Sequence, residues 1–179
     1  MINKAVFLDR DGVINRDYGY VGPVECFDFL AGVKEALALI KSKGYLLVLI
    51  TNQSGIARGK YGMSDFLATT AYMQQILALH HARLDAVYCC PHHPQAEISL
   101  YRKKCNCRKP LPGLFEKACL ELNIDPAVSA AAGDRARDLE GPRSLGVKKL
   151  ALIGAAPNEC ASAAYADRFP DLLSFAKNL

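Results

Sequence analysis

Short apolar runs alternate along the chain with segments whose apolar residues recur at helical spacing. Residues 45–50 (YLLVLI) are apolar throughout, as expected for a strand that is buried on both faces of a parallel sheet. The run 127–132 is rich in alanine and ambiguous by propensity, but its position before Gly133 and Asp134 favours a strand. The predicted strands are residues 5–8, 45–50, 86–88, 127–132 and, as the last of them, 149–153.

Four segments are predicted to be helical. Residues 32–43 carry apolar side chains at helical spacing, and the glycine that follows them can end this helix. Ser64 can cap the N-terminus of a long helix that runs to about residue 81. Residues 112–122 are typical of a helix with proline near its first turn. The tail beyond Ala161 is also predicted to be helical.

This alternation predicts an α/β protein with a Rossmann-like parallel sheet and helices on both faces. In such sheets the functional groups gather beyond the carboxyl ends of the strands. Three predicted strands end in polar side chains, at Asp9 and Asp11, at Thr51 and Asn52, and at Asp134. We therefore expect these side chains to meet at one edge of the sheet.

The composition is that of an ordinary globular protein. The chain has 179 residues, 51% of them hydrophobic and 22% charged, and this length favours a single domain, 1–179. No apolar stretch approaches the ~20 residues that a membrane span needs. The first apolar run ends in charge at residues 9–11, so no secretory signal is visible. We expect a cytoplasmic protein with reduced thiols and no membrane partner.

The cysteines separate into two groups. The chain has seven, an odd number that excludes a complete disulfide framework. Three are scattered, and we expect them to be buried structural thiols: Cys26, Cys119 and Cys160. The other four cluster between residues 89 and 107, which suggests a metal before a disulfide.

Four residues of this cluster match a zinc site, namely Cys90, His92, Cys105 and Cys107. Three thiolates and one imidazole make a tetrahedral Zn²⁺ set, and four protein ligands leave no position for a catalytic water, so the zinc would be structural. It would hold the zinc-binding loop, about residues 90–107, in place. Spacing alone leaves His93 open as an alternative to His92, keeps Cys89 conceivable, and allows reduced cysteines without a metal.

A pair of carboxylates, Asp9 and Asp11, follows the first predicted strand. Extended geometry would turn both toward the same side. A charged turn is the simpler interpretation of an isolated pair, but two other strand ends bring Thr51 and Asp134 to the same edge. Carboxylates that hold Mg²⁺ can neutralise and orient a phosphoryl group, so this edge suits phosphoryl chemistry.

Together these motifs resemble the haloacid dehalogenase superfamily of phosphohydrolases. The resemblance rests on D-x-D-G at 9–12, Thr51-Asn52, Lys109-Pro110, and Gly133-Asp134 with Asp138. It implies that Asp9 is the nucleophile, forming an aspartyl-phosphate, and that Asp11 is the acid and base. It implies Mg²⁺ on the Asp9 side chain, the Asp11 main-chain carbonyl and Asp134. Thr51 and Lys109 would contact the transferred phosphoryl group.

Each of these positions also has a plain structural interpretation. Thr51 and Asn52 could form a strand-to-loop turn, and Lys109 could be a solvated surface lysine. Asp134 could be the N-cap of a helix. Asp138 is either a group that supports the site or a solvated helix residue.

Longer strings narrow the resemblance to the bacterial D-glycero-D-manno-heptose 1,7-bisphosphate 7-phosphatases, in the histidinol-phosphatase-like subgroup. They are DYGYV at 17–21, TNQSGIARG at 51–59, CPHHPQ at 90–95 and CNCRKP at 105–110. The resemblance assigns zinc to Cys90, His92, Cys105 and Cys107. It implies Mg²⁺-dependent removal of the C7 phosphate in the synthesis of nucleotide-heptose precursors of lipopolysaccharide. Histidinol-phosphate phosphatase shares the catalytic and zinc motifs and is the alternative, although the 17–21 string favours the heptose.

A sugar bisphosphate needs cations for its second phosphate. Arg108 and Arg135 suit it, because a guanidinium binds phosphate oxygens bidentately, although the family often has lysine at the second place. Arg58 is a weaker candidate, and the alternative is that it only braces the 53–59 loop. The residues expected to contact the sugar or its phosphates are Asp17, Tyr18, Gly19, Tyr20, Asn52, Gln53 and Ser54, with local packing as the alternative for the tyrosines.

The chain leaves no room for a separate cap domain. Between Asp11 and Thr51 the predicted elements are a loop and one helix. Between Thr51 and Lys109 they are a helix, a short strand and the zinc-binding loop. We therefore expect an uncapped domain whose specificity lies in three loops, 17–21, 53–59 and 91–109.

A basic patch at residues 102–104, 108 and 109 raises a different class of function, a zinc-stabilised, non-catalytic nucleic-acid-binding module. The net charge is only +4, and no series of stacking aromatic residues accompanies the patch. We therefore expect a small-molecule sugar bisphosphate as the partner, and no nucleic acid. No self-complementary interface is legible, so a monomer is the default.

Overall fold

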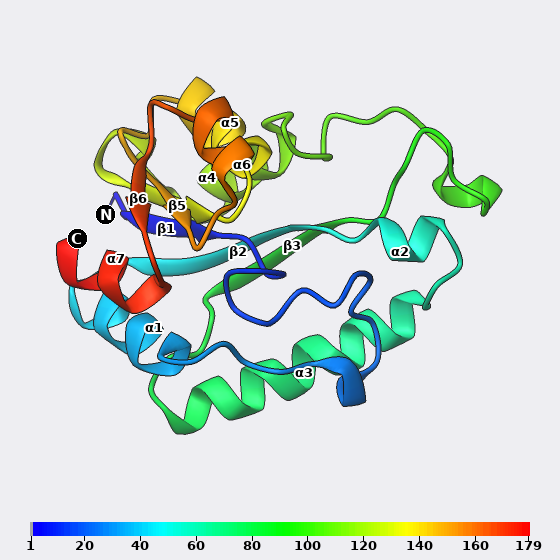
Figure 1. Ribbon diagram of the computed structural model, residues 1–179, viewed down its shortest axis with the longest axis horizontal. Coiled ribbons are helices and arrows are strands. Elements are labelled where there is room, and N and C mark those ends of the chain that lie inside the picture. Colours follow the sequence, from blue (N-terminus) through cyan, green and yellow to red (C-terminus); the bar gives the residue numbers. More distant parts are fainter. Residues whose placement is uncertain (1) are drawn as a thin grey trace.

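A six-stranded parallel sheet forms the centre of the computed structural model, which describes residues 2–179 (Figure 1). The strand order is β3-β2-β1-β4-β5-β6. β1 (Ala5–Leu8) lies between β2 (Leu46–Asn52) and β4 (Ala130–Gly133), so successive strands are added on opposite sides of β1. The other strands are β3 (Ala86–Cys90), β5 (Lys149–Ile153) and β6 (Asp167–Phe169). The predicted parallel sheet is confirmed.

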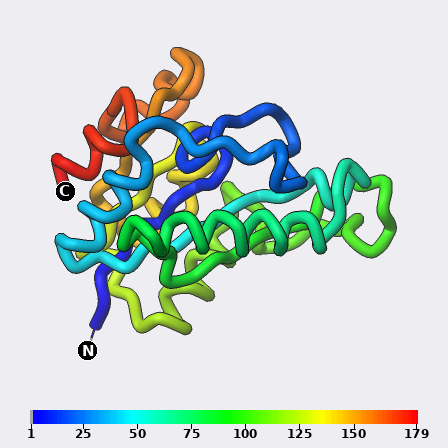
Figure 2. Tube along the Cα trace, turned by 90° about the horizontal axis from the view of Figure 1, so that it is seen from below, coloured from blue at the N-terminus to red at the C-terminus, as the bar shows by residue number. Residues whose placement is uncertain are grey.

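Helices cover both faces of the sheet, as predicted (Figure 1). One face carries α1 (Val33–Ser42), α3 (Met63–Leu79) and α7 (Leu172–Asn178). The other carries α4 (Gly113–Glu121), α5 (Ala136–Ser144) and α6 (Pro157–Ser162). Figure 2 shows α3 as a long rod along the first face. The connections hold the short helix α2 (Ser54–Ala57) and three 3-10 turns, η1 (Val24–Cys26), η2 (Ser99–Tyr101) and η3 (Pro126–Val128).

Alternate side chains of the central strand enter two different cores. Val6 and Leu8 pack with α1, α3 and α7, whereas Ala5 and Phe7 pack with α4 and α5. All four side chains are buried. Successive residues of a strand point to opposite faces, so a strand that is covered on both faces needs apolar residues at every position. This explains why the run reads as continuous rather than alternating.

The long helix α3 begins at a different residue from the predicted one. Gly62 is its N-cap, and the Gly62 backbone N–H donates a hydrogen bond to Asp65 Oδ2 at 2.7 Å. The prediction that Ser64 is the N-cap is wrong, because Ser64 lies in the first turn. The carboxylate three residues into the helix reaches back to satisfy a free backbone donor.

The C-terminal part also differs from the prediction. β5 is a strand, as expected, but it is not the last one, because β6 lies between α6 and α7. β6 pairs only with β5, and Asp167 and Arg168 are exposed. A three-residue edge strand with two charged positions has no apolar run that would reveal it. Only Phe169 turns inward, with its ring 5.5 Å from that of Phe175.

The three scattered cysteines are less buried than predicted. Cys26 is exposed, so the expectation of a buried thiol is wrong there. Cys119 and Cys160 are half-buried at the margin of the core beside α4 and α5. Cys26 lies in the turn η1, which contributes no buried residue and therefore offers its thiol no apolar cover.

The connections between the strands form no separate cap domain. In residues 9–45 they hold η1 and α1, and in residues 53–85 they hold α2 and α3. Loops therefore cover the carboxyl edge of the sheet.

Across residues 2–179, no helix combines the length and the apolar character needed to cross a membrane.

The burial of α1 against the sheet yields a stability prediction. Leu37 is fully buried in the core, so Leu37→Ala should lower the free energy of unfolding by about 2–5 kcal/mol through lost apolar burial and a residual cavity. Leu120→Ala is the matched control, because Leu120 is 85% exposed and its truncation should change stability by no more than about 0.5 kcal/mol. Urea unfolding of both variants measures the difference. Equal effects would contradict this packing.

Candidate active site

The carboxyl ends of β1, β2 and β4 meet at one edge of the sheet, as the sequence predicts. Asp9 follows β1, Thr51 and Asn52 end β2, and Asp134 follows β4. These three strands are neighbours, because β1 pairs with both β2 and β4. Residues that lie more than 120 positions apart in the chain therefore reach a single site.

A buried lysine links two carboxylates at the centre of this edge. Lys109 Nζ lies 2.7 Å from Asp9 Oδ1 and 2.8 Å from Asp138 Oδ1, and it donates a third bond to the Ile50 carbonyl at 2.8 Å. Burial alone would lower the pKa of Lys109, but Asp138 and Asp9 outweigh it and raise that pKa. Lys109 is 3% exposed, so it is not the solvated surface lysine of the plain interpretation. Asp138 is equally buried and supports the site.

Asn52 fixes the backbone that carries this lysine. The Lys109 backbone N–H donates to Asn52 Oδ1 at 3.0 Å, and Asn52 Nδ2 donates to the Lys109 carbonyl at 3.1 Å. The end of β2 and the end of the cysteine-rich loop are therefore joined by two reciprocal hydrogen bonds. Asn52 also lines the cavity described below, so its side chain has a structural task beside any contact with substrate.

Three carboxylates converge closely enough to hold a cation. Oxygens of Asp9, Asp134 and Asp138 lie within 4.8 Å of one another, and Asp134 Oδ1 is buried without a hydrogen-bond partner. Burial raises the pKa of Asp9 to about 6, although Lys109 opposes the rise. Burial, together with the charges of Asp9 and Asp138, raises the pKa of Asp134 to about 8. Crowded, desolvated oxygens of this kind fit a hard cation such as Mg²⁺.

A glycine permits this close approach. Gly12 has a φ of +85°, and a Cβ on it would lie 2.5 Å from Asp134 Oδ2. A side chain at this position would therefore be strained and would displace the carboxylate. The turn after β1 consequently requires glycine in the D-x-D-G motif.

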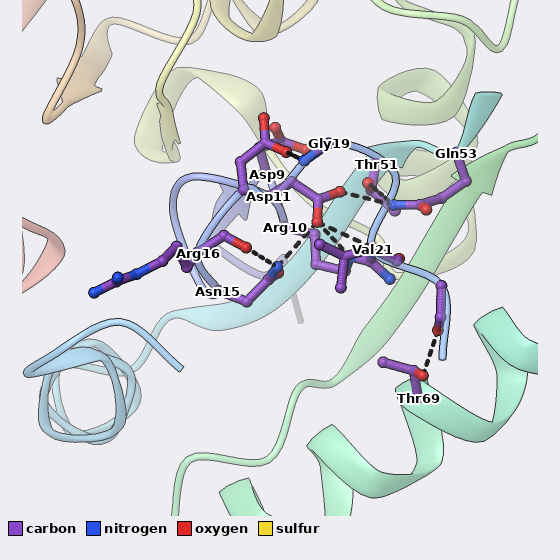
Figure 3. A network of polar contacts seen from close by, with 12 residues as sticks. Asp9, Arg10, Asp11, Asn15, Arg16, Gly19, Val21, Thr51, Gln53 and Thr69 are labelled. Carbon is purple, nitrogen blue, oxygen red and sulfur yellow. Dashed lines mark hydrogen bonds and ion pairs between the residues drawn. The ribbon is translucent and has the colours of Figure 1, made fainter. Parts of the chain in front are cut away.

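Asp11 is held by three donors (Figure 3). Arg10 Nη2 and Asn15 Nδ2 both lie 3.0 Å from Asp11 Oδ1, and Gln53 Nε2 lies 3.1 Å from Asp11 Oδ2. Arg10 is buried and also donates to the Val21 carbonyl, so it ties the 17–21 loop to the catalytic turn. The Asp11 side chain is therefore fixed before any substrate binds.

A cavity of about 410 Å³ opens over these groups. Most residues that the sequence predicts for substrate binding line it: Asp17, Gly19, Tyr20, Asn52, Gln53, Ser54, Arg108 and Arg135. Tyr18 does not line it. That side chain is 55% exposed, and its hydroxyl donates to Asp28 at 2.7 Å. Thr51 is fully buried beneath Gln53, whose Nε2 donates to its hydroxyl at 2.8 Å.

The cavity is also lined by Tyr61 and Arg137, which belong to none of the sequence motifs described above. Aromatic residues beside a helix are usually packing residues. The sequence around Tyr61 therefore gives no indication of a functional role. Arg137 follows Arg135 at a spacing of two, which could have been recognised as a second cation at the same helix start.

The arginines of the cavity differ in their partners. Arg135 is paired, with Nη2 lying 3.2 Å from Asp17 Oδ2 and Nε lying 3.6 Å from Asp134 Oδ2. Arg58, Arg108 and Arg137 form no ion pair with a carboxylate anywhere in residues 2–179. Arg58 contacts His93, and Arg108 donates to the His92 carbonyl at 3.3 Å. Three uncompensated guanidiniums thus face one cavity.

A second cluster lies in the loop that leads to Lys109. The ligand atoms of Cys90, His92, Cys105 and Cys107 lie within 4.8 Å of one another. The Cys107 sulfur lies 2.9 Å from that of Cys90, 3.2 Å from that of Cys105, and 3.2 Å from His92 Nδ1. Sulfurs at ~2.3 Å from a tetrahedral zinc would be slightly farther apart, so a small expansion admits the ion.

The neighbouring candidates lie outside this cluster. The ring of His93 is used elsewhere, since Nδ1 accepts from the Gln95 backbone N–H and Nε2 contacts Arg58. Cys89 packs with the small cluster around Ile56 and Tyr61. The geometry therefore favours His92 over His93, in agreement with the assignment that the family resemblance implies.

Comparison with known proteins agrees with this site. The family model for haloacid dehalogenase-like hydrolase matches residues 8–146, which contain every carboxylate that lines or borders this cavity. The D-glycero-beta-D-manno-heptose-1,7-bisphosphate 7-phosphatase of Vibrio cholerae is 48% identical over 153 residues, which are 86% of this chain and 82% of that protein. The protein of the same name from Haemophilus ducreyi is 47% identical and covers 86% and 84%.

Solved structures agree as well. The D,D-heptose 1,7-bisphosphate phosphatase from B. bronchiseptica, complexed with magnesium and phosphate, superimposes with a TM-score of 0.87 at 31% identity, over 98% of this chain and 97% of that one. The enzyme of that name from Burkholderia thailandensis gives a TM-score of 0.70 at 30% identity, over 98% and 97%. The chain is therefore a haloacid dehalogenase-like hydrolase, and it belongs to the family of the bacterial heptose 1,7-bisphosphate 7-phosphatases.

Proposed function

We propose that this phosphoric monoester hydrolase removes the C7 phosphate of D-glycero-β-D-manno-heptose 1,7-bisphosphate. One observation carries the proposal: two separate groups of residues that suit a phosphate line a single cavity. The first is the cluster around Asp9 and Lys109, and the second is the group of unpaired arginines, Arg58, Arg108 and Arg137. A monophosphate would leave the second group uncompensated. The names of the curated relatives support the sugar and its β anomer.

The chain's own residues support transfer through Asp9. Its carboxylate attacks phosphorus, the bond to the C7 oxygen breaks, and an aspartyl-phosphate remains. Asp11 gives a proton to the departing oxygen and later takes one from the water that hydrolyses the aspartyl-phosphate. Thr51 donates a hydrogen bond to the transferred phosphoryl group, and Lys109 offsets the charge on its oxygens. Mg²⁺, held by the Asp9 side chain, the Asp11 carbonyl and Asp134, would neutralise the charge that repels the nucleophile.

Substrate selection would fall to loops rather than to a cap. Segments 17–21, 53–59 and 91–109 each contribute residues to the wall of the cavity. The paired Arg135 orders this wall by joining Asp17 of the first loop to Asp134 beside β4. We assign Arg135 to positioning this wall and the distal phosphate chiefly to Arg108. The reaction would serve nucleotide-heptose synthesis for lipopolysaccharide in the cytoplasm.

We further propose that Cys90, His92, Cys105 and Cys107 hold a structural zinc. The described loop between His92 and Cys105 contains the short turn η2 but no α-helix or strand, and its backbone is joined to α2 by a hydrogen bond from the Ile98 N–H to the Ala57 carbonyl. Metal binding would supply the missing ordering free energy. Arg108 and Lys109 follow Cys107 directly, so the ion would place both cations at the cavity.

A substrate panel tests the proposed function. The β anomer of the heptose 1,7-bisphosphate should have a kcat/KM at least about tenfold above those of the α anomer and histidinol phosphate, measured by phosphate release. Product analysis should show that the C1 phosphate remains. Asp9→Asn is the control and should lose turnover by at least about 10³-fold. Preference for histidinol phosphate would refute the assignment.

The unpaired arginines give a second expectation. Arg108→Ala removes a charged hydrogen-bonding partner worth about 1.5–3 kcal/mol, so kcat/KM on the bisphosphate should fall about 10- to 100-fold. The fall should be less than about threefold on a sugar monophosphate that lacks the distal phosphate. Arg102→Ala is the matched control, because Arg102 donates to the carbonyls of Ala96 and Glu97 and does not line the cavity. Equal losses on both substrates would contradict a distal phosphate site.

Zinc content gives a third expectation. Cys107→Ser should lower the bound zinc, measured by elemental analysis, and lower the midpoint of thermal unfolding by several degrees, since about 1 kcal/mol shifts it by about 2–4 °C in a domain of this size. Cys119→Ser provides the comparison, because Cys119 is similarly half-buried but lies outside the cluster. Undiminished zinc in Cys107→Ser would exclude this ligand set.

A further inference from the structure

A buried chain of hydrogen bonds runs from Tyr61 to the acid and base residue. The Tyr61 hydroxyl donates to Gln53 Oε1. Gln53 Nε2 donates to Asp11 Oδ2 at 3.1 Å and to Thr51 Oγ1 at 2.8 Å. Gln53 and Thr51 are each 1% exposed and Tyr61 is 8% exposed. Part of this chain is visible in Figure 3, where dashed lines join the Gln53 amide nitrogen to Asp11 and to Thr51.

All polar atoms of the Gln53 amide are occupied by protein groups. Its oxygen accepts from Tyr61, and its nitrogen carries two N–H groups for two acceptors, Asp11 and Thr51. Both N–H groups of this side chain are therefore taken, and only the second acceptor site of its oxygen is left for a sugar, although Gln53 lines the cavity. Beside its predicted contact with substrate, Gln53 therefore has a positioning task.

Tyr61 decides which way the amide faces. In the opposite orientation the amide oxygen would face the carboxylate of Asp11, and two acceptors would be in contact without a proton. A phenol that donates its proton to the oxygen excludes this orientation. Burial raises the pKa of Tyr61, so the phenol keeps that proton through the neutral range.

The ring of Tyr61 is itself held by close packing. A Cβ on Gly22 would lie 2.2 Å from the ring, and so would a Cβ on Gly55. These two backbones, from different loops, leave room for the ring only because both residues are glycine. Ile56 and Phe66 complete the small apolar cluster around it. The hydroxyl therefore has a fixed position that does not depend on substrate.

The same amide fixes the direction in which the Thr51 hydroxyl donates its proton. A hydroxyl offers one proton and two acceptor sites, and one acceptor site of Thr51 is used by Gln53. The proton of Thr51 thus remains for another acceptor, as required of a donor to a phosphoryl oxygen. One amide consequently orients two of the groups to which the proposed mechanism assigns roles.

We propose that Tyr61 and Gln53 are positioning residues that act in series, Tyr61 through Gln53, to hold Asp11 and Thr51 in their reactive orientation. This proposal rests on the roles that the proposed function gives Asp11 and Thr51. Neither residue of the pair needs to touch the substrate.

A double-mutant cycle tests the proposal. Tyr61→Phe keeps the packed ring and removes only the hydroxyl, and Gln53→Met keeps the length of the side chain and removes its polar atoms. Each single variant should lower kcat on the sugar bisphosphate about tenfold or more and change KM by less than about twofold. Because Tyr61 acts through Gln53, the double variant should lose no more than about twofold beyond Gln53→Met. Multiplying losses, or an unchanged kcat in Tyr61→Phe, would overturn the proposal.

The leaving group separates this role from a general structural one. An alkyl phosphate needs a proton from Asp11 when its ester bond breaks, whereas 4-nitrophenyl phosphate has a leaving group that departs without one. Tyr61→Phe should therefore reduce kcat/KM on the sugar bisphosphate at least about fivefold more than on 4-nitrophenyl phosphate. Equal reductions would show that Asp11 is not the group being positioned. Tyr88→Phe is the matched control, since its hydroxyl bonds Glu121 and lies outside the cavity.

Failure of the proposed function would be distinguishable. If the wild type rejects the heptose bisphosphate, the substrate assignment falls, and the cycle is measured on an alkyl phosphate that the wild type does hydrolyse. The positioning proposal fails only if the variants then behave independently or like the wild type.

Discussion

The ion-pair cluster of Lys109 with Asp9 and Asp138 is the interaction on which the rest of the site depends. An ammonium that is 3% exposed persists because two carboxylates and a backbone carbonyl replace its water. The positive charge of the same ammonium offsets the repulsion among three crowded carboxylates. Strands, helix starts and loops are arranged so that this one nitrogen can be reached from β1, β2 and α5.

The cysteine-rich loop, residues 90–107, leads directly to that lysine. Its last cysteine stands two residues before Lys109, and Asn52 binds the Lys109 backbone from the end of β2. The loop is therefore fixed at both ends, by its own cluster and by the sheet. A charged side chain can be buried this deeply only when the backbone that carries it cannot withdraw, because removing one partner leaves uncompensated buried charge.

Much of the fold and site could be predicted from the sequence, for physical reasons. Continuous apolar runs mark strands that are covered on both faces, and polar residues at three strand ends mark the active edge. β6 could not be found, because a short edge strand buries one side chain only. Asp138 remained open because its role arises from a contact with Lys109, which belongs to another part of the chain. Tyr61 was not selected because it lies outside every motif, although its partner Gln53 is close in the sequence. The cap of α3 was misplaced because serine is a favoured N-cap residue, whereas here Gly62 is the N-cap and Asp65 accepts from its backbone N–H.

The placement of β1 at the middle of the sheet has a consequence for how the protein is made. During synthesis, Asp9 leaves the ribosome before its partner Lys109, which follows 100 residues later, and β4 follows later still. At about 5–20 residues per second, the carboxylates of the turn after β1 are exposed to water for several seconds before Lys109 has been made. β1 gains its second neighbour, β4, only after β2 and β3 have been made. The carboxyl edge that carries the site is thus complete only after β4 and the start of α5 have been made, so a shortened chain that ends before residue 134 lacks both Asp134 and Asp138.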